Sequence, residues 1–265
     1  MGLLLWRDGL ADGLLDRAGV TDPTALSQHI DLFLSQHLLW SSLLYHVAGI
    51  LIFGLWYGLL RKRRARAPLR RVFPRGSAAA LFLTGVGLQL LTSCALSLVE
   101  ILWPAALQNY NELMEGISEL TPMSLLLTVV LAPMGEELLC RGVVLHYAQK
   151  ASGRFWVANL IQATIFGVIH LNWVQGSYAF VFGCVLGAVC HRHRSVWASI
   201  ALHAIINLAG MLVVEPLFAP VPEKLAFLLP LLGLFVLLCW AGLHLDQKIL
   251  DRQEKLMEQE AADGQ

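Results

Sequence analysis

Charged residues are scarce in this sequence. Its 265 residues include 19 lysines and arginines and 19 aspartates and glutamates, 14% of the chain, whereas a soluble domain carries about 25%. The formal net charge is zero, so no overall basic or acidic field indicates a nucleic-acid partner. Hydrophobic residues make up 57% of the chain, and the mean hydropathy is +0.62. The composition therefore indicates a membrane protein.

Several familiar signatures are also missing. The N-terminus "MGLLLWRDGLADG" has no basic segment and only a short apolar run, so it does not resemble a signal peptide. No G-x-S-x-G or H-E-x-x-H occurs, and no Cys–His pairing outcompetes the polar groups described below. The five cysteines are odd in number and lack metal-type spacing, which favours buried reduced thiols over disulfides or a zinc ribbon. They are Cys94, Cys140, Cys184, Cys190 and Cys239.

Long apolar runs are abundant, and a membrane-spanning helix needs about 20 residues. Strand-like alternation does not occur, so the sequence predicts an all-α polytopic transmembrane helix bundle, organised as a single membrane domain over residues 1–265. Residues 1–37 are expected to form short interfacial helices, and residues 246–265 a polar, solvated cytoplasmic tail. The seven predicted spans are 38–60, 77–103, 122–148, 155–172, 177–191, 196–214 and 225–245.

The charges between the spans predict an orientation. Residues 61–75 contain eight basic residues and no acidic one, whereas residues 108–121 contain three glutamates and no basic one. Basic loops face the cytoplasm. With seven spans every basic loop falls on the same side, which predicts the N-terminus outside and the C-terminus inside. Topogenic charge of this kind is also a commoner reason for the run 61–75 than a nucleic-acid patch.

The third span carries the costliest polar group, in the stretch "APMGEELLCRG". Glu137 and Arg141 are spaced i,i+4 and are suited to an ion pair, whereas Glu136 is rotated by about 100° from Glu137 and cannot share that pairing as well. The two carboxylates therefore have different environments, as acid–base chemistry requires. Pro133 and Gly135 are expected to kink the span. A purely structural ion pair explains Glu137 and Arg141 equally well, but it leaves Glu136 without a role.

Two later spans carry further polar pairs at i,i+4 spacing. Phe166 and His170 share one helical face, and so do His203 and Asn207. Taken singly, each pair is more simply an interhelical hydrogen-bonding group. Glu100, His46 and His146 are further polar residues of the spans, and Ser195 and Ser199 are hydroxyls without a partner in the pattern. Together, the three sites supply the groups that proton transfer, water activation and oxyanion stabilisation need.

These motifs resemble a known family. On successive membrane helices the chain reads "EELLCR", "FGVIH" and "HAIIN", and residues 182–207 read "FGCVLGAVCHRHRSVWASIALHAIIN". This order is similar to the CPBP group of intramembrane proteases, which includes type II CAAX prenyl proteases and bacteriocin-processing enzymes and is also called the Abi domain. The resemblance covers roughly residues 120–210, which would be the catalytic core.

The resemblance implies an intramembrane endopeptidase of the glutamic type, without a cofactor, that cuts a CAAX-type tail, a leader or sorting peptide or a similar substrate near the membrane surface. Glu136 would be the general base that activates water, and His170 would hold that water. His203 and Asn207 would stabilise the oxyanion. Glu137, Arg141 and Phe166 would support them. A zinc site ligated by Glu136, His170 and His203 is the disfavoured alternative.

Two other functions fit the same buried cluster: a proton-coupled transporter and a catalytically silent membrane scaffold. No internal repeat supports the transporter. Helix rise gives a further expectation, since it sets Glu136 and His203 at one depth and His170 about 12 Å further outward. The Ala/Leu/Arg-rich usage and short loops favour a bacterial inner membrane.

Overall fold

The structure is a computed structural model that describes residues 23–61, 72–115, 120–214, 217 and 225–263. All elements in these ranges are helical, so the predicted all-α class is confirmed. The chain divides into two compact units, Met1–His46 and Val47–Gln265. In the first unit the structure describes only part of a helix, and everything below concerns the second unit unless stated.

The first helix, α2, runs from Pro23 to Arg61 as one continuous element. The expected break between interfacial helices and a first span near residue 37 is therefore absent from the described backbone, and residues 1–22 lie outside the described residues. The segment "PTALSQHIDLFLSQ" offers no proline or glycine after Pro23 to stop a helix. Its polar residues lowered the hydropathy without interrupting the hydrogen-bonded backbone.

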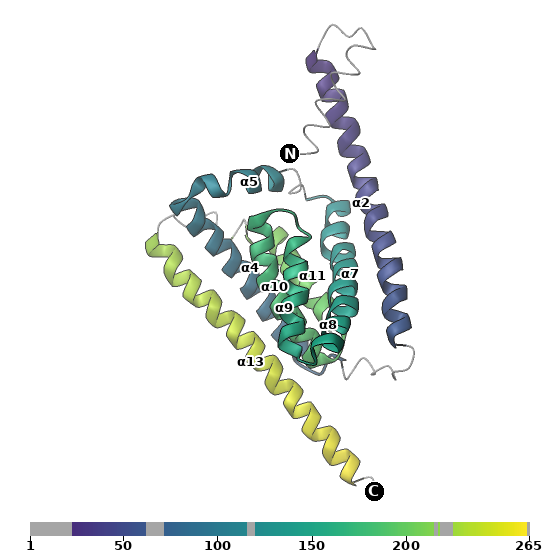
Figure 1. Cartoon of the computed structure of the whole chain (residues 1–265). Coiled ribbons are helices and arrows are strands. Elements are labelled where there is room, and N and C mark those ends of the chain that lie inside the picture. The colour runs from purple at the N-terminus through teal and green to yellow at the C-terminus, as the bar shows by residue number, and fades with distance from the viewer. Residues whose placement is uncertain (1–22, 62–71, 116–119, 215–216, 218–224, 264–265) are drawn as a thin grey trace. The chain divides into compact units, whose positions relative to one another are not determined.

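Each of the six later predicted spans is helical, and the third consists of the consecutive elements α6 to α8. Two additional short helices, η1 and α5, follow α4 (Figure 1). Within the described residues, five helices are long and apolar enough to cross a membrane, whereas α9 and α11 are shorter apolar helices. The chain is thus an integral membrane protein. In order, the elements are α4 (Ser77–Leu102), η1 (Pro104–Ala106), α5 (Gln108–Glu115), α6 (Pro122–Leu125), η2 (Leu126–Leu131), α7 (Ala132–Glu137), η3 (Leu138–Val144), α8 (Leu145–Ser152), α9 (Phe155–Val168), α10 (Trp173–His193), α11 (Val196–Leu212) and α13 (Leu225–Asp263).

The boundary between the fourth and fifth spans differs from the prediction. Helix α9 ends at Val168 rather than near residue 172, and α10 begins at Trp173 rather than at 177. The side chain of Asn172 causes the early start, because its oxygen accepts hydrogen bonds from the N–H groups of Val174 and Gln175 at 3.0 Å each. Hydropathy missed this cap because the first turn of α10 contains polar residues.

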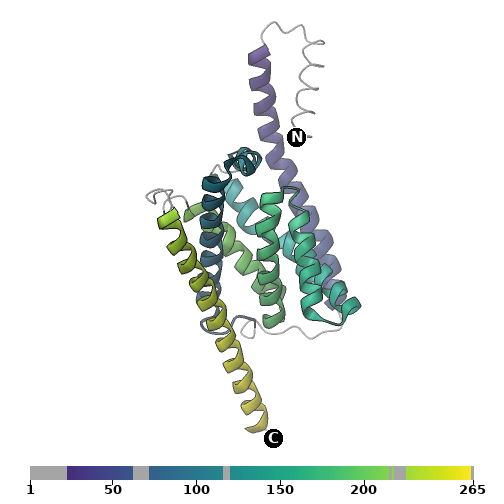
Figure 2. The same cartoon turned by 60° about the vertical axis from the view of Figure 1, so that its left-hand side comes forward.

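Helix α11 occupies the centre of the bundle. It packs against α4 on one side, against η2, α7 and η3 on another, and against α10 (Figure 2). Leu202 and Ile206 of α11 are fully buried in the main apolar cluster, together with Phe166 and Leu186. The strongest remaining pairings are α4 with α13 and α9 with α10. This arrangement brings the third, fourth and sixth predicted spans together.

A buried polar cluster fastens α13 to the bundle. His193 Nε2 lies 2.9 Å from Asp246 Oδ2, and Ser77 Oγ donates to Asp246 Oδ1 at 3.0 Å. The other ring nitrogen of His193 donates to the carbonyl oxygen of Val72 at 2.7 Å. The tail predicted to be solvated from residue 246 therefore begins with a fully buried carboxylate. Hydropathy alone assigns Asp246 to the tail, because a local average does not detect its partner His193, which is 53 positions away.

The outer faces of the bundle are apolar. Leu51 and Leu55 of α2 are exposed, as are Leu237 and Trp240 of α13. Because a bilayer solvates such side chains at no cost, whereas water does not, these faces are suited to contact with lipid.

Candidate active site

The third predicted span is a helix with two π-helical stretches, η2 and η3, which flank the turn α7. The N–H of Ala132 bonds to the carbonyl of Leu127 and that of Leu145 bonds to Cys140, each five residues back. Glu136 and Glu137 lie in the α-helical turn between the two stretches. Such π-bulges occur frequently at functional sites. The irregularity expected at Pro133 and Gly135 is thus present as a change of hydrogen-bond register.

The ion pair predicted between Glu137 and Arg141 is present and completely buried. Arg141 Nη1 lies 2.7 Å from Glu137 Oε1, and neither side chain is exposed. Arg141 Nη2 also donates to the carbonyl oxygen of Gly183 at 3.2 Å, and the guanidinium lies 4.5 Å from the centroid of the Phe166 ring. A buried ion pair is tolerable only when further hydrogen bonds and close packing offset its desolvation. Gly183 and Phe166 supply these contacts.

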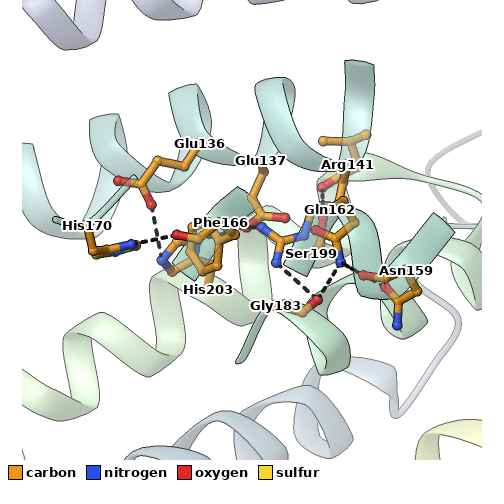
Figure 3. A network of polar contacts seen from close by, with 11 residues as sticks. Glu136, Glu137, Arg141, Asn159, Gln162, Phe166, His170, Gly183, Ser199 and His203 are labelled. Atoms are coloured by element: carbon orange, nitrogen blue, oxygen red, sulfur yellow. Dashed lines mark hydrogen bonds and ion pairs between the residues drawn. The ribbon is translucent and has the colours of Figure 1, made fainter. Parts of the chain in front are cut away.

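His203 joins the two glutamates. Its Nδ1 lies 2.9 Å from Glu137 Oε1, and its Nε2 lies 3.8 Å from Glu136 Oε2. Because Glu137 accepts from Arg141 through the same oxygen, its carboxylate is an acceptor, and Nδ1 of His203 carries the donated proton. The distance to Glu136 is longer than a hydrogen bond. The ring is therefore oriented by Glu137 with its second nitrogen toward Glu136 (Figure 3).

The two adjacent glutamates have different surroundings, as the sequence predicts. The Glu137 side chain is 0% exposed and is held by Arg141 and His203. The Glu136 side chain is 27% exposed. One carboxylate is thus fixed inside the protein, and the other can meet a ligand.

His170 comes to the site through Phe166. Its Nδ1 donates to the carbonyl oxygen of Phe166 at 2.7 Å, which leaves Nε2 as the free ring nitrogen of the neutral form. The Phe166 ring meets the rings of His170 and His203 edge to face, with centroids 5.0 and 5.6 Å away. The expected outward displacement of His170 by about 12 Å is not what the structure shows. Both histidines pack on one phenylalanine because α9 is shorter than the predicted span and His170 lies in the turn after it.

The hydrogen bond of Asn207 is made to the third predicted span and not to this cluster. Its Nδ2 donates to the carbonyl oxygen of Thr128 at 2.8 Å. The N–H of Ala132 bonds to the Leu127 oxygen five residues back. In the same hydrogen-bond register the Thr128 oxygen would accept from the N–H of residue 133, but residue 133 is a proline and has no N–H. The Asn207 amide therefore satisfies a carbonyl that the proline leaves without its helical donor.

Sequence reasoning missed two buried amides behind Arg141. Gln162 Nε2 donates to the Gly183 oxygen at 2.8 Å, the same oxygen that Arg141 uses, and to Asn159 Oδ1 at 2.8 Å. Asn159 Nδ2 donates in turn to the Cys184 oxygen at 2.9 Å. The signal was available, because Asn159, Gln162 and Phe166 are spaced i, i+3 and i+7 on one face of an apolar helix.

Ser199, which has no partner in the sequence pattern, is buried beside this network, and its hydroxyl donates to the Val196 oxygen at 2.9 Å (Figure 3). The zinc ligands named as the sequence alternative are Glu136, His170 and His203. In the part of the chain that the structure describes, no three histidine, cysteine or acidic side chains gather closely enough to hold a metal ion. All five cysteines are free thiols, and four of them are buried.

The fold and site together define a class: a polytopic helical membrane protein with a buried Glu–Arg pair, a histidine oriented by it and a second, accessible glutamate. Residues 118–209 match the family model described as type II CAAX prenyl endopeptidase Rce1-like. The matched segment is about a third of the chain, and over this segment the chain is similar to a family of endopeptidases. The matched segment contains α6–α10 and most of α11, and it agrees with the predicted range 120–210. No curated protein and no solved structure matches the chain.

Proposed function

We propose that the protein is an intramembrane endopeptidase of the glutamic type, in which Glu136 activates a water molecule for attack on a peptide bond. One observation carries the proposal: His203 binds Glu137 through Nδ1 at 2.9 Å and directs Nε2 toward Glu136 at 3.8 Å. Glu137 is occupied by two cationic or donating groups, whereas Glu136 is partly exposed. The accessible carboxylate is therefore the candidate base.

The proposed reaction proceeds in two steps. Glu136 takes a proton from water as the water oxygen attacks the scissile carbonyl carbon, and a tetrahedral intermediate with an oxyanion forms. The intermediate then collapses, the C–N bond breaks, and the protonated Glu136 returns the proton to the leaving amine. No external oxidant or cofactor is needed for this balance.

The histidines assist in distinct ways. His170, with Nδ1 held by the Phe166 oxygen, offers Nε2 to the attacking water. His203 in its doubly protonated form donates one N–H to Glu137 and directs the other at the oxyanion. Asn207 gives one amide N–H to Thr128, and the proposal assigns the second to the oxyanion. Glu137, Arg141 and Phe166 hold this geometry.

The substrate class follows from the family. A type II CAAX endopeptidase model implies a peptide or protein substrate at the membrane, and we assign a CAAX-type tail as the first candidate. The basic run 61–75 and the seven apolar helices favour an N-out, C-in orientation. We place the protein in a bacterial cytoplasmic membrane, on the residue usage and short loops.

The test is cleavage of a CAAX-type peptide by the full-length protein in lipid nanodiscs, in wild type and in the variants Glu136→Ala, Glu137→Ala and His203→Ala. We expect Glu136→Ala to abolish cleavage while the protein keeps its thermal stability. Glu137→Ala is expected to lose both activity and stability, because it leaves Arg141 buried without its partner. Cleavage that persists in Glu136→Ala would contradict the assignment.

Two further arms separate the alternatives. Cleavage that survives strong chelators supports the metal-free mechanism, and cleavage that stops with chelator and returns with zinc would assign Glu136, His170 and His203 as ligands instead. Proton-dependent solute flux in liposomes without proteolysis would favour a transporter. A protein that neither cleaves nor transports any candidate would be a scaffold.

A further inference from the structure

A cavity of about 1220 Å³ lies at the end of the bundle where α2, α8 and α10 terminate. Its walls come from the last turns of these helices, from the start of α11 and from one face of the C-terminal part of α13. This part of α13 contributes positions 247, 250, 251, 253, 254 and 257, and all of these except 253 recur at helical spacing on one face. Glu136 and His170 are not among the residues that line the cavity, although Arg141, which pairs with Glu137, is one of them.

The lining has an excess of positive charge. The cationic side chains are Arg61, Lys150, Arg192 and Arg194, with Arg141 at the inner wall, and the acidic ones are Asp251 and Glu254. Arg141 is already paired with Glu137, and Arg194 lies 3.7 Å from Glu254. Asp251 then faces three cations, and of these Arg61 donates to the neutral hydroxyl of Tyr57 at 2.7 Å. The net charge of the lining favours an anion.

The cavity also has an apolar wall. Leu60, Leu145 and Leu250 line it together with Met257. A ligand that fills the whole space therefore needs an anionic group next to an apolar body. A free inorganic anion would leave the apolar wall uncovered.

Two exposed tryptophans near the cavity indicate its depth in a bilayer. Trp156 at the start of α9 is 65% exposed, and Trp197 at the start of α11 is 53% exposed. Each of these helices begins three residues after the end of the preceding helix, α8 or α10, both of which line the cavity. Tryptophans with exposed rings at helix ends are typical of the headgroup level of a bilayer. The basic groups of the cavity thus lie at the depth of lipid phosphates.

We propose that this cavity binds the phosphate headgroup of an anionic phospholipid, with Lys150 and Arg192 as principal contacts and with acyl chains against its apolar wall. Basic pockets between membrane helices on the cytoplasmic side are suited to such headgroups. A zwitterionic lipid binds more weakly, because its own cation opposes the positive lining. The site is separate from the catalytic proposal and stands whether or not the protein cleaves peptides.

The test is native mass spectrometry of the full-length protein in detergent, titrated with phosphatidylglycerol and, separately, with phosphatidylcholine of the same chains. The cavity variant is Lys150→Gln/Arg192→Gln. The matched control is Arg154→Gln/Arg252→Gln, which removes the same charge from exposed positions outside the lining. We expect the cavity variant to bind phosphatidylglycerol about thirtyfold more weakly than wild type, and the control about as tightly as wild type.

A variant that binds phosphatidylglycerol more tightly than wild type provides a test that misfolding cannot explain. Asp251→Asn removes an acidic group from the lining and is expected to bind phosphatidylglycerol about fivefold more tightly than wild type. Equal loss in the cavity variant and the control, or equal binding of phosphatidylcholine by wild type, would overturn the proposal. Displacement of bound phosphatidylglycerol by millimolar inorganic phosphate would assign the site to free phosphate and would also overturn it.

Discussion

His203 Nδ1 lies 2.9 Å from Glu137 Oε1, so a histidine on α11 is oriented by a carboxylate on α7 that Arg141 also holds at 2.7 Å. Because of this contact, the two adjacent glutamates have different roles in the structure. Glu137 becomes the fixed acceptor inside the protein, and its contacts determine where the second nitrogen of His203 points. Glu136 is left as the partly exposed carboxylate.

The Glu137–Arg141 pair is expected to behave as a buried unit. Arg141→Met should lower the free energy of unfolding by about 3–5 kcal/mol, because it leaves the Glu137 charge in a dry environment. Glu137→Met/Arg141→Met should cost less than the single change, because both charges are then removed. Reversible unfolding in mixed micelles measures the difference.

The exposed pair of Arg194 and Glu254 provides the control. These side chains are 85% and 62% exposed, and Arg194→Gln should change stability by less than about 1 kcal/mol. If Arg141→Met and Arg194→Gln cost the same, the buried pair is not structural.

Asn207 should be coupled energetically to Pro133. In wild type, Asn207→Ala removes the donor from the Thr128 oxygen and should cost about 1 kcal/mol. In the Pro133→Ala background the new N–H can take over that oxygen, so the same change should cost less. A double-mutant cycle on unfolding free energies measures the coupling, and strict additivity would show that the proline does not create the need for the amide.

Gly187 should tolerate no side chain. A Cβ at this position would collide with Asn159 Oδ1 and lie 2.7 Å from Gln162 Nε2. We expect Gly187→Ala to destabilise the protein by about 1–3 kcal/mol by forcing α9 and α10 apart. Gly233→Ala is the matched control, since nothing lies within 4 Å of a Cβ there, and it should be neutral or stabilising by up to about 1 kcal/mol. Equal effects at the two glycines would contradict the packing described for the amides.

Asp246 should anchor α13 to the bundle. Asp246→Ala leaves His193 Nε2 and Ser77 Oγ without this acceptor, at about 1–3 kcal/mol for each buried group left unpaired. Limited proteolysis should then release the C-terminal part of α13 faster than in wild type. Asp251→Ala, at an exposed position on the same helix, should leave the proteolysis rate unchanged. Unchanged proteolysis in both variants would mean that apolar packing alone holds α13.

The sequence predicted the helices and the glutamate pair because both depend on local pattern. Apolar runs have a minimum length, and the i,i+4 spacing of Glu137 and Arg141 fixes a shared face. The contact between His203 and Glu137 spans 66 positions, and no local spacing specifies it. The same holds for Asp246, which looked solvated until His193 and Ser77 were placed beside it.

The depth of a side chain along the bundle was harder to predict than the helical face on which it lies. Counting residues from the predicted span boundaries misplaced His170, because α9 already ends at Val168 and the Asn172 cap starts the next helix early. Asn159 and Gln162 were not predicted, because neutral amides lack the charge that marks a residue as costly in an apolar helix. Their regular spacing with Phe166 was nonetheless present in the sequence.

The most direct test of the central assignment is the turnover of Glu136→Gln on a CAAX-type peptide, measured together with thermal stability. The substitution keeps the size of a side chain that is partly exposed and lies beyond hydrogen-bond distance of His203, so stability should remain near that of wild type. Removal of the general base should lower kcat by about 10²–10⁴-fold. A folded Glu136→Gln protein with kcat within about tenfold of wild type would fall outside that range and contradict the account.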